Sequence, residues 1–213
     1  NSEFLTYFWL IAIVTVVFTF SLVIRSGNWS HAHFIDSLFQ TVSILTSTGY
    51  TIADYDLWAF FAQFILLILM FIGSMGGSTG GGMKIVRVML ILKYAALETR
   101  RMLHAKAIIP IRIGEKYISG DVIRNTLGFF LFYIFIFVFT SFFLTTLNID
   151  LKSSMGVAAS ALGNIGPALG QFGPTNNYAL MPDVGKWLLT FCMLLGRLEI
   201  FTVVVLFSRT FRR

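Results

Sequence analysis

The sequence predicts an all-α integral membrane protein in which one plan of span, re-entrant pore helix and span occurs twice in tandem. The first reason is composition: 56% of the residues are hydrophobic and 12% are charged, with a mean hydropathy of +0.80, whereas soluble domains carry about 25% charged residues. The second is length, because four runs approach the roughly 20 apolar residues that cross a bilayer. These runs are residues 7–24, 58–72, 126–147 and 187–207. The third is repetition, because Tyr7 and Gly49 are as far apart as Arg124 and Gly166.

The positive charge is concentrated in one connection between spans. The net charge is +6, and more than half of the sixteen Lys and Arg residues lie between Lys84 and Arg124. Residues 26–57 contain no Lys or Arg and three Asp residues. This asymmetry is typical of a cytoplasmic loop facing an external one, so it indicates a membrane protein and no nucleic-acid partner. We expect a multi-pass protein of the cell membrane with both chain ends in the cytoplasm.

Each predicted repeat contains a segment that is too short to cross the membrane. The first, "HFIDSLFQTVSILTSTGY", has helical apolar spacing and stops at Gly49. The second, "DLKSSMGVAASALGNIGP", begins with Ser153 or Ser154 as a possible cap and stops at Gly166, where Pro167 prevents continuation. Both segments are therefore predicted to be half-helices that enter the membrane and return.

The ends of these half-helices are candidate ion sites. Backbone that leaves the helix at membrane depth needs partners from protein or from a water-filled path, and a helix C-terminus attracts cations. A row of carbonyl oxygens can replace the hydration shell of an ion. The predicted filter residues are Ser47, Thr48, Gly49 and Tyr50 in the first repeat and Asn164, Ile165, Gly166 and Pro167 in the second. The alternative is a tight turn between two buried helices.

A glycine-rich run interrupts the second span after Ile72. It predicts a break and a hinge in that helix, below the filter. The alternatives are a close-packed patch of small residues and a phosphate-binding loop, and the second fails because Met83 and Ile85 flank Lys84 where a Walker motif needs Gly-Lys-Ser/Thr. The predicted gate residues in this run are Gly73, Gly76, Gly77, Gly80, Gly81, Gly82 and Lys84.

Two charges interrupt the fourth span, Arg197 and Glu199 in "LGRLEI". Charges at this depth mark a functional site unless they are paired, and residues two apart on a helix point about 200° apart. We expect Arg197 to face the pore as a barrier to cations and Glu199 to pack inward. The alternative is a buried structural ion pair.

The predicted division of the chain is a first membrane repeat at 1–95, a cytoplasmic basic connection at 96–122 and a second membrane repeat at 123–213. In the connection, Ile109, Ile111 and Ile113 alternate with polar residues before Gly114, which indicates a short hairpin or extended segment. The single Cys192 is read as an apolar filler, and no metal-ligand cluster accompanies the three His residues.

Four motifs resemble one family: "TSTGY", "GSMGGSTGGGMKIVR", "NIGPALG" and "LGRLEIFTVVVLF". Together they resemble the Trk/Ktr/HKT superfamily of potassium transporters, and most of all a Trk-type membrane subunit. The resemblance implies four repeats in a fourfold pseudo-symmetric cation channel fold, with K⁺ as the transported ion and no organic cofactor. It implies that the glycine run is the intramembrane loop below the filter, and that this chain is similar to the third and fourth repeats. Channel and symporter activity both fit.

The same resemblance implies partners. Two further pore repeats are expected, either from an N-terminal half absent from this sequence, which the start without Met favours, or from a second copy. A homodimer of complete subunits and a cytoplasmic nucleotide-binding regulatory ring are also implied, and the basic connection is a candidate contact for that ring or for lipid headgroups. The alternatives are a sodium-permeable or nonselective transporter and a nonconducting assembly or sensor subunit. We do not expect an enzyme, because no nucleophile, base and orienting group occur together.

Overall fold

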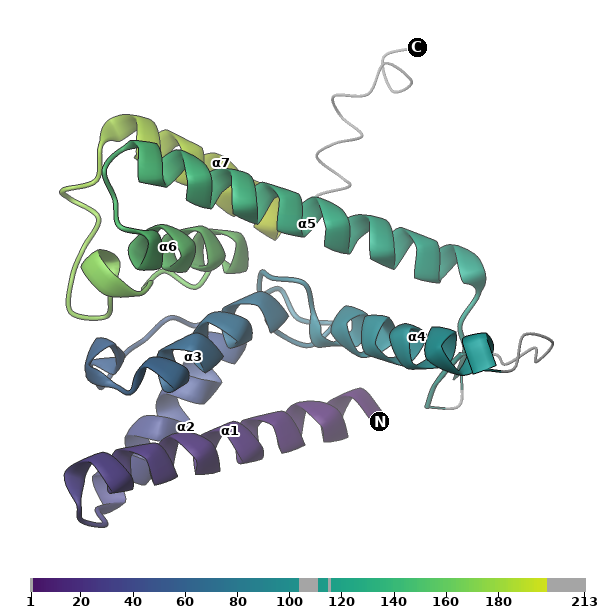
Figure 1. Cartoon of the computed structure of the whole chain (residues 1–213), viewed down its shortest axis with the longest axis horizontal. Helices are drawn as coiled ribbons and strands as arrows, with labels where there is room; N and C mark the ends of the chain where they lie inside the picture. The colour runs from purple at the N-terminus through teal and green to yellow at the C-terminus, as the bar shows by residue number, and fades with distance from the viewer. Residues whose placement is uncertain (1, 104–110, 115, 199–213) are drawn as a thin grey trace.

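The computed structural model of the chain describes residues 2–103, 111–114 and 116–198 (Figure 1). The fold is helical apart from one small hairpin. Its helices are α1 (Ser2–Ser26), α2 (His31–Leu45), α3 (Phe60–Ile72), α4 (Ile85–Leu103), α5 (Gly120–Thr146), α6 (Leu151–Gly163) and α7 (Asp183–Arg197), with 3₁₀ turns η1 (Tyr55–Leu57) and η2 (Gly170–Phe172). The end of the predicted fourth span, including Glu199, lies outside the described residues.

Two of the described helices, α1 and α5, are long and apolar enough to cross a membrane, and α3 is a shorter apolar helix. Many of their large apolar side chains are exposed, among them Phe20, Phe64 and Phe135. Exposed apolar side chains on this scale are unusual for a soluble protein, which rarely leaves extended apolar patches open to water. They agree with helices that face lipid or other protein segments.

The short helices α3 and α6 lie between the long helices α1 and α5, and α7 runs alongside α5 (Figure 1). Helix α1 packs on α2, whereas α5 and α7 pack on α6, and α3 packs against both α2 and α6. The contact between α3 and α6 joins the two halves of the chain. Fully buried side chains such as Phe18, Leu66 and Tyr133 form the core around these contacts.

The two helices predicted to be re-entrant, α2 and α6, begin with side-chain caps. The hydroxyl of Ser30 accepts a hydrogen bond from the Ala32 amide at the start of α2. At the start of α6, the carboxylate of Asp150 accepts from the Ser153 amide at 3.0 Å, so the expectation that Ser153 or Ser154 is the cap is wrong. Desolvation raises the pKa of Asp150, but the hydrogen bonds from Ser153 outweigh it and hold the pKa below its ordinary value.

The glycine run breaks the second span, as predicted. Helix α3 ends at Ile72 and α4 begins at Ile85, and the residues between them form turns and irregular backbone. The basic connection contains the predicted hairpin: β1 (Arg112–Ile113) pairs antiparallel with β2 (Lys116–Tyr117). Its turn includes Gly114, which has φ +60°. The hairpin packs on the middle of α4, where the ammonium of Lys93 donates to the Arg112 carbonyl at 2.9 Å.

Candidate functional site

The two predicted filter segments have matching backbone conformations. Ser47 and Asn164 follow the re-entrant helices with φ values of 56° and 53°. Two residues later, Gly49 and Gly166 have φ values of 76° and 109°. This left-handed region is readily adopted by glycine and costs other residues about 1–2 kcal/mol. Each half-helix is therefore followed by the same sharp change of chain direction.

Each predicted filter segment is held by a serine on the preceding helix, and the two serines occupy equivalent positions in the two halves. The Ser43 carbonyl accepts from the amides of Thr48 and Gly49 at 2.9 and 3.4 Å, and its hydroxyl donates to the Tyr50 carbonyl at 2.6 Å. In the second half, the carbonyl and hydroxyl of Ser160 accept from the amides that follow α6.

The Ile165 amide donates to the Ser160 carbonyl at 3.0 Å, and the Gly166 amide donates to the Ser160 hydroxyl at 3.1 Å. The spacing between Ser43 and Ser160 equals the spacing between Gly49 and Gly166. The sequence therefore contained a signal for both serines, which the motif analysis missed.

The two filter segments touch each other. A β-carbon placed on Gly49 would overlap the carbonyl oxygen of Ile165, and it would lie 3.2 Å from Cδ of Pro167. Segments more than a hundred residues apart in the chain therefore meet through their backbones. At Gly166, by contrast, a β-carbon would meet no atom within 4 Å, so this glycine borders open space on the side away from the contact.

Hydroxyl groups orient carbonyls of the filter segments. The Tyr178 hydroxyl donates to the Gly166 carbonyl at 2.7 Å. Burial raises the pKa of Tyr178 to about 12, so the phenol stays protonated and remains a donor at neutral pH. A carbonyl oxygen accepts two hydrogen bonds, so Gly166 keeps one lone pair for another partner. The Ser47 hydroxyl is buried without a hydrogen-bond partner among the described residues.

The glycine run packs against the C-terminal ends of α2 and α6. Gly82 donates its amide to the Leu162 carbonyl at 3.3 Å, and a β-carbon on Gly81 would lie 2.5 Å from the Gly163 carbonyl oxygen. On the first half, a β-carbon on Gly80 would lie 3.3 Å from the Thr46 carbonyl. The glycines therefore allow an approach that side chains would block, which is a physical reason for glycine at these positions.

Three charged side chains hold the glycine run in place. Lys84, which is 8% exposed, donates from its ammonium to the carbonyls of Ser78 and Gly80 at 2.5 and 2.7 Å. Arg197 donates to the Thr79 carbonyl. On the opposite flank, the carboxylate of Glu3 accepts from the Gly76 amide at 2.6 Å.

The cations and the glycine run enclose a cavity of about 210 Å³. Its walls include Thr79, Gly80, Lys84, Gly196 and Arg197. Of the predicted gate residues, Gly80, Gly82, Lys84 and Arg197 line this cavity, and Glu199 lies outside the described residues. Gly73 packs inside the run against Gly81 and Gly82, whereas Gly76 and Gly77 are exposed. The bond between Glu3 and Gly76 had no signal in the sequence, because it joins the first turn of α1 to a non-helical segment far away in the chain.

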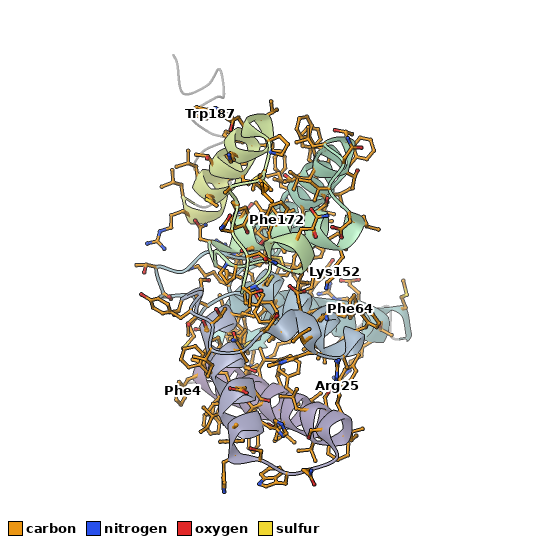
Figure 2. The ribbon with its side chains drawn as sticks, turned by 90° about the vertical axis from the view of Figure 1, so that its left-hand side faces the viewer. Phe4, Arg25, Phe64, Lys152, Phe172 and Trp187 are labelled. Carbon is orange, nitrogen blue, oxygen red and sulfur yellow. The ribbon has the colours of Figure 1, made fainter. Side chains whose placement is uncertain are left out.

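A charged contact ties the outer parts of the two halves together. The carboxylate of Asp56 accepts from the Lys152 ammonium and from the Gly170 amide, both at 2.8 Å. Figure 2 shows Lys152 at the junction between the N-terminal helices and the C-terminal ones. Nearby, the buried Tyr55 donates its hydroxyl to the Ala168 carbonyl at 2.8 Å. These bonds fix the backbone that follows the second filter segment to the first half of the chain.

Comparison with known proteins identifies the family. Residues 4–212 match the model of the TrkH family, described as cation transport protein. The chain is 36% identical over its whole length to the Trk system potassium uptake protein TrkH of Vibrio parahaemolyticus, covering 44% of that protein. It is 34% identical to TrkH of Escherichia coli K12, covering 97% of this chain and 42% of the relative.

A solved structure agrees with the sequence matches. The crystal structure of the potassium transporter TrkH from Vibrio parahaemolyticus superposes with a TM-score of 0.91 and 34% identity, covering all of this chain and 45% of that one. The chain therefore spans less than half the length of the relatives it matches. Because the family model covers nearly all of its residues, the chain belongs to the TrkH family of cation transport proteins.

Proposed function

We propose that this chain supplies two of the four filter-bearing repeats of a membrane pore for potassium uptake. The contact between the Gly49 backbone and the Ile165 carbonyl is the observation that supports this proposal most directly. It brings together two non-helical segments with matching left-handed residues, each at the C-terminal end of a half-helix. Relatives named as potassium uptake proteins make K⁺ the transported ion to test first.

The proposed filter is formed by backbone carbonyls. Segments 47–50 and 164–167 follow α2 and α6, so the partial negative charges of both helix ends act on the same region. Carbonyl oxygens there take the place of water around a dehydrating cation. The hydrogen bonds from Ser43 and Tyr178 hold the Tyr50 and Gly166 carbonyls in fixed directions, which reduces the reorganisation needed when an ion enters.

The proposed gate lies directly below this filter. The glycine run obstructs the path, and Arg197 adds a positive charge that repels cations. The bond from Arg197 to Thr79 and the bonds from Lys84 to Ser78 and Gly80 hold the run in its closed position. Opening requires these bonds to break or move together, which the freedom of the glycine backbone allows.

The proposed orientation places residues 96–122 and both chain ends in the cytoplasm of a multi-pass protein of the cell membrane. The excess of Lys and Arg between Lys84 and Arg124 supports it. Residues 1–95 and 123–213 then form the two membrane repeats on either side of the basic connection.

The proposed assembly completes the ring around the ion. Two filter segments surround about half of a fourfold circumference, so two further repeats are needed from the rest of the protein or from a second copy. A homodimer of complete subunits, carrying a nucleotide-binding ring on the basic cytoplasmic face, is the arrangement that we propose. The membrane provides the remaining contacts.

Ion flux into liposomes tests the proposal. The complete protein should pass K⁺ and Rb⁺ and discriminate against Na⁺. Equal flux of K⁺ and Na⁺ would favour the nonselective alternative, and no flux of any cation by a folded protein would favour an assembly or sensor subunit. Empty liposomes are one control. A variant with both Gly49 and Gly166 replaced by Ser is the other, because the added side chains disturb both filter segments.

A further inference from the structure

Two neighbouring cavities lie between α4, the β1–β2 hairpin and the first turns of α5, and the first of them shares Phe129 with the cavity beside the glycine run. The first has a volume of about 320 Å³ and the second about 370 Å³. Both are large enough for a small-molecule site, for which roughly 300–1,000 Å³ is typical. Ile118 lines both cavities, so the two spaces share a wall at the base of the hairpin.

The first cavity is apolar. Its walls include Leu90 from α4, Ile113 from β1, and Val122 and Phe129 from α5. The guanidinium of Arg87 lies over the ring of Phe129 at 4.2 Å from the ring centre, which places one cation at its edge. A hydrocarbon chain would bury its surface against these side chains.

The second cavity is basic. Arg101 from α4 and Arg124 from α5 line it, together with the polarisable ring of Tyr94. Within the described residues, Arg124 makes no ion pair or hydrogen bond, and Arg101 pairs with the partly exposed Glu98 at 2.8 Å. Arg112 in the hairpin and Lys93, which bonds its carbonyl, add to the positive charge of this region. A phosphate group would find two guanidinium groups there, which match its geometry well.

The position of the two cavities along α5 indicates which kind of ligand would carry both a phosphate group and an apolar chain. The cavities flank residues 120–129, at the end of α5 that follows the basic connection, and the same helix continues into an apolar stretch long enough to cross a membrane. The basic cavity therefore lies at the level where headgroups are found, next to an apolar cavity that can take an acyl chain. A free phosphate ion would use the basic cavity alone and leave the apolar one unoccupied.

We propose that these two cavities form a binding site for an anionic phospholipid of the cytoplasmic leaflet. The phosphate binds between Arg101 and Arg124, and an acyl chain enters the space between Leu90, Val122 and Phe129. Basic pockets between membrane helices on the cytoplasmic side are suited to such lipids. The choice of leaflet follows from the orientation proposed above, whereas the site itself does not depend on which cation is transported.

Native mass spectrometry of the complete protein in detergent tests the site. Phosphatidylglycerol and phosphatidylcholine with identical acyl chains are added in turn, and the bound fraction is measured over a range of concentrations. We expect phosphatidylglycerol to be retained and phosphatidylcholine to be lost. R101Q and R124Q should each weaken retention about fivefold, and the double variant should weaken it multiplicatively.

Matched variants separate the site from general charge attraction. Arg100→Gln removes an exposed cation on the same helix that lines neither cavity, and it should leave retention unchanged. Val122→Trp fills the apolar cavity from an exposed position without altering charge, so it should reduce phosphatidylglycerol binding while both arginines remain.

Several outcomes would overturn the proposal. Equal retention of the two lipids by the parent protein would do so, as would R100Q and R101Q having the same effect. Displacement of the lipid by inorganic phosphate at millimolar concentration would show a site for the free ion. Loss of binding to a soluble protein in R101Q and R124Q, without any lipid retention in the parent, would show a protein interface.

Discussion

The Cα atom of Gly49 lies against the carbonyl oxygen of Ile165, so closely that a β-carbon at residue 49 would overlap that oxygen. This contact links the non-helical segments that follow α2 and α6. Because both segments are held by a serine on the preceding half-helix, their relative position is fixed from both sides. Gly49 is therefore required by its backbone angle and by its neighbour, whereas Gly166 is required by its backbone angle alone.

Replacing the two glycines by alanine should have unequal effects. Gly49→Ala should lower stability and abolish selective K⁺ flux, because the added methyl group displaces the Ile165 carbonyl. Gly166→Ala has open space for the methyl group and should lose only about 1–2 kcal/mol of stability for the left-handed backbone. Its K⁺ over Na⁺ preference should fall while the protein stays folded. Thermal unfolding in detergent and liposome flux measure the two effects.

Gly27→Ala is the matched control for both variants. Gly27 has φ +72° and open space around it, and it lies in the turn between α1 and α2. The variant should therefore show the backbone cost without any change in selectivity. If Gly49→Ala is no less stable than Gly27→Ala, the contact with Ile165 does not constrain the folded protein.

Arg197→Ala should raise ion flux. The substitution removes the bond to the Thr79 carbonyl and a positive charge from a narrow path, where unit charges 4 Å apart interact by about 4 kcal/mol at an effective dielectric near 20. Arg197→Lys keeps the charge and should keep flux low. A deletion within residues 76–82 should raise flux as well, because it shortens the obstruction. Rubidium uptake at or below the parent level in folded Arg197→Ala and the deletion would exclude both elements as gates.

Lys84→Met should loosen the glycine run from within. The thioether keeps the apolar length of the side chain, but the carbonyls of Ser78 and Gly80 lose a charged donor. Hydrogen bonds to charged groups contribute about 1.5–3 kcal/mol, so we expect a lower unfolding temperature and a higher flux. Lys93→Met, at an exposed lysine on α4 that bonds the hairpin and not the glycine run, should leave the flux unchanged. The same flux in Lys84→Met and the parent would mean that the run closes without this lysine.

Much of the fold could be predicted because membranes restrict the choices for a backbone. The apolar runs predicted the helices, and the basic segment predicted their orientation in the membrane. The glycine run correctly predicted the break between Ile72 and Ile85. The left-handed conformation at Gly49 and Gly166 agrees with the predicted turn after each half-helix. These features depend on short stretches of sequence, so local patterns were sufficient.

The contacts that assemble the site could not be predicted in the same way. Asp150 caps α6 although two serines follow it, because its carboxylate is placed to accept from the Ser153 amide. The bonds from the Gly76 amide to Glu3 and from Arg197 to the Thr79 carbonyl join segments whose relative position depends on the packing of the whole chain. Neither residue spacing nor hydrophobic pattern contains that information.

The pair formed by Asp56 and Lys152 should couple the two halves measurably. Their side chains are 18% and 39% exposed, so solvent screens them less than it screens the pair formed by Asp183 and Lys186 at 89% and 43%. A double-mutant cycle with alanine at Asp56 and Lys152 should give a coupling free energy of about 1–2 kcal/mol, against about 0.3–0.5 kcal/mol for the exposed pair.

The single variants of this pair should differ from each other. Asp56→Ala should cost more than Lys152→Ala, because it also leaves the partly buried Gly170 amide without its acceptor. Raising the salt concentration should weaken the coupling of the exposed pair more than that of the inner one, since buried charges are screened less. Equal losses of unfolding temperature in the two single variants, together with no coupling between them, would show that the halves are held together without this contact.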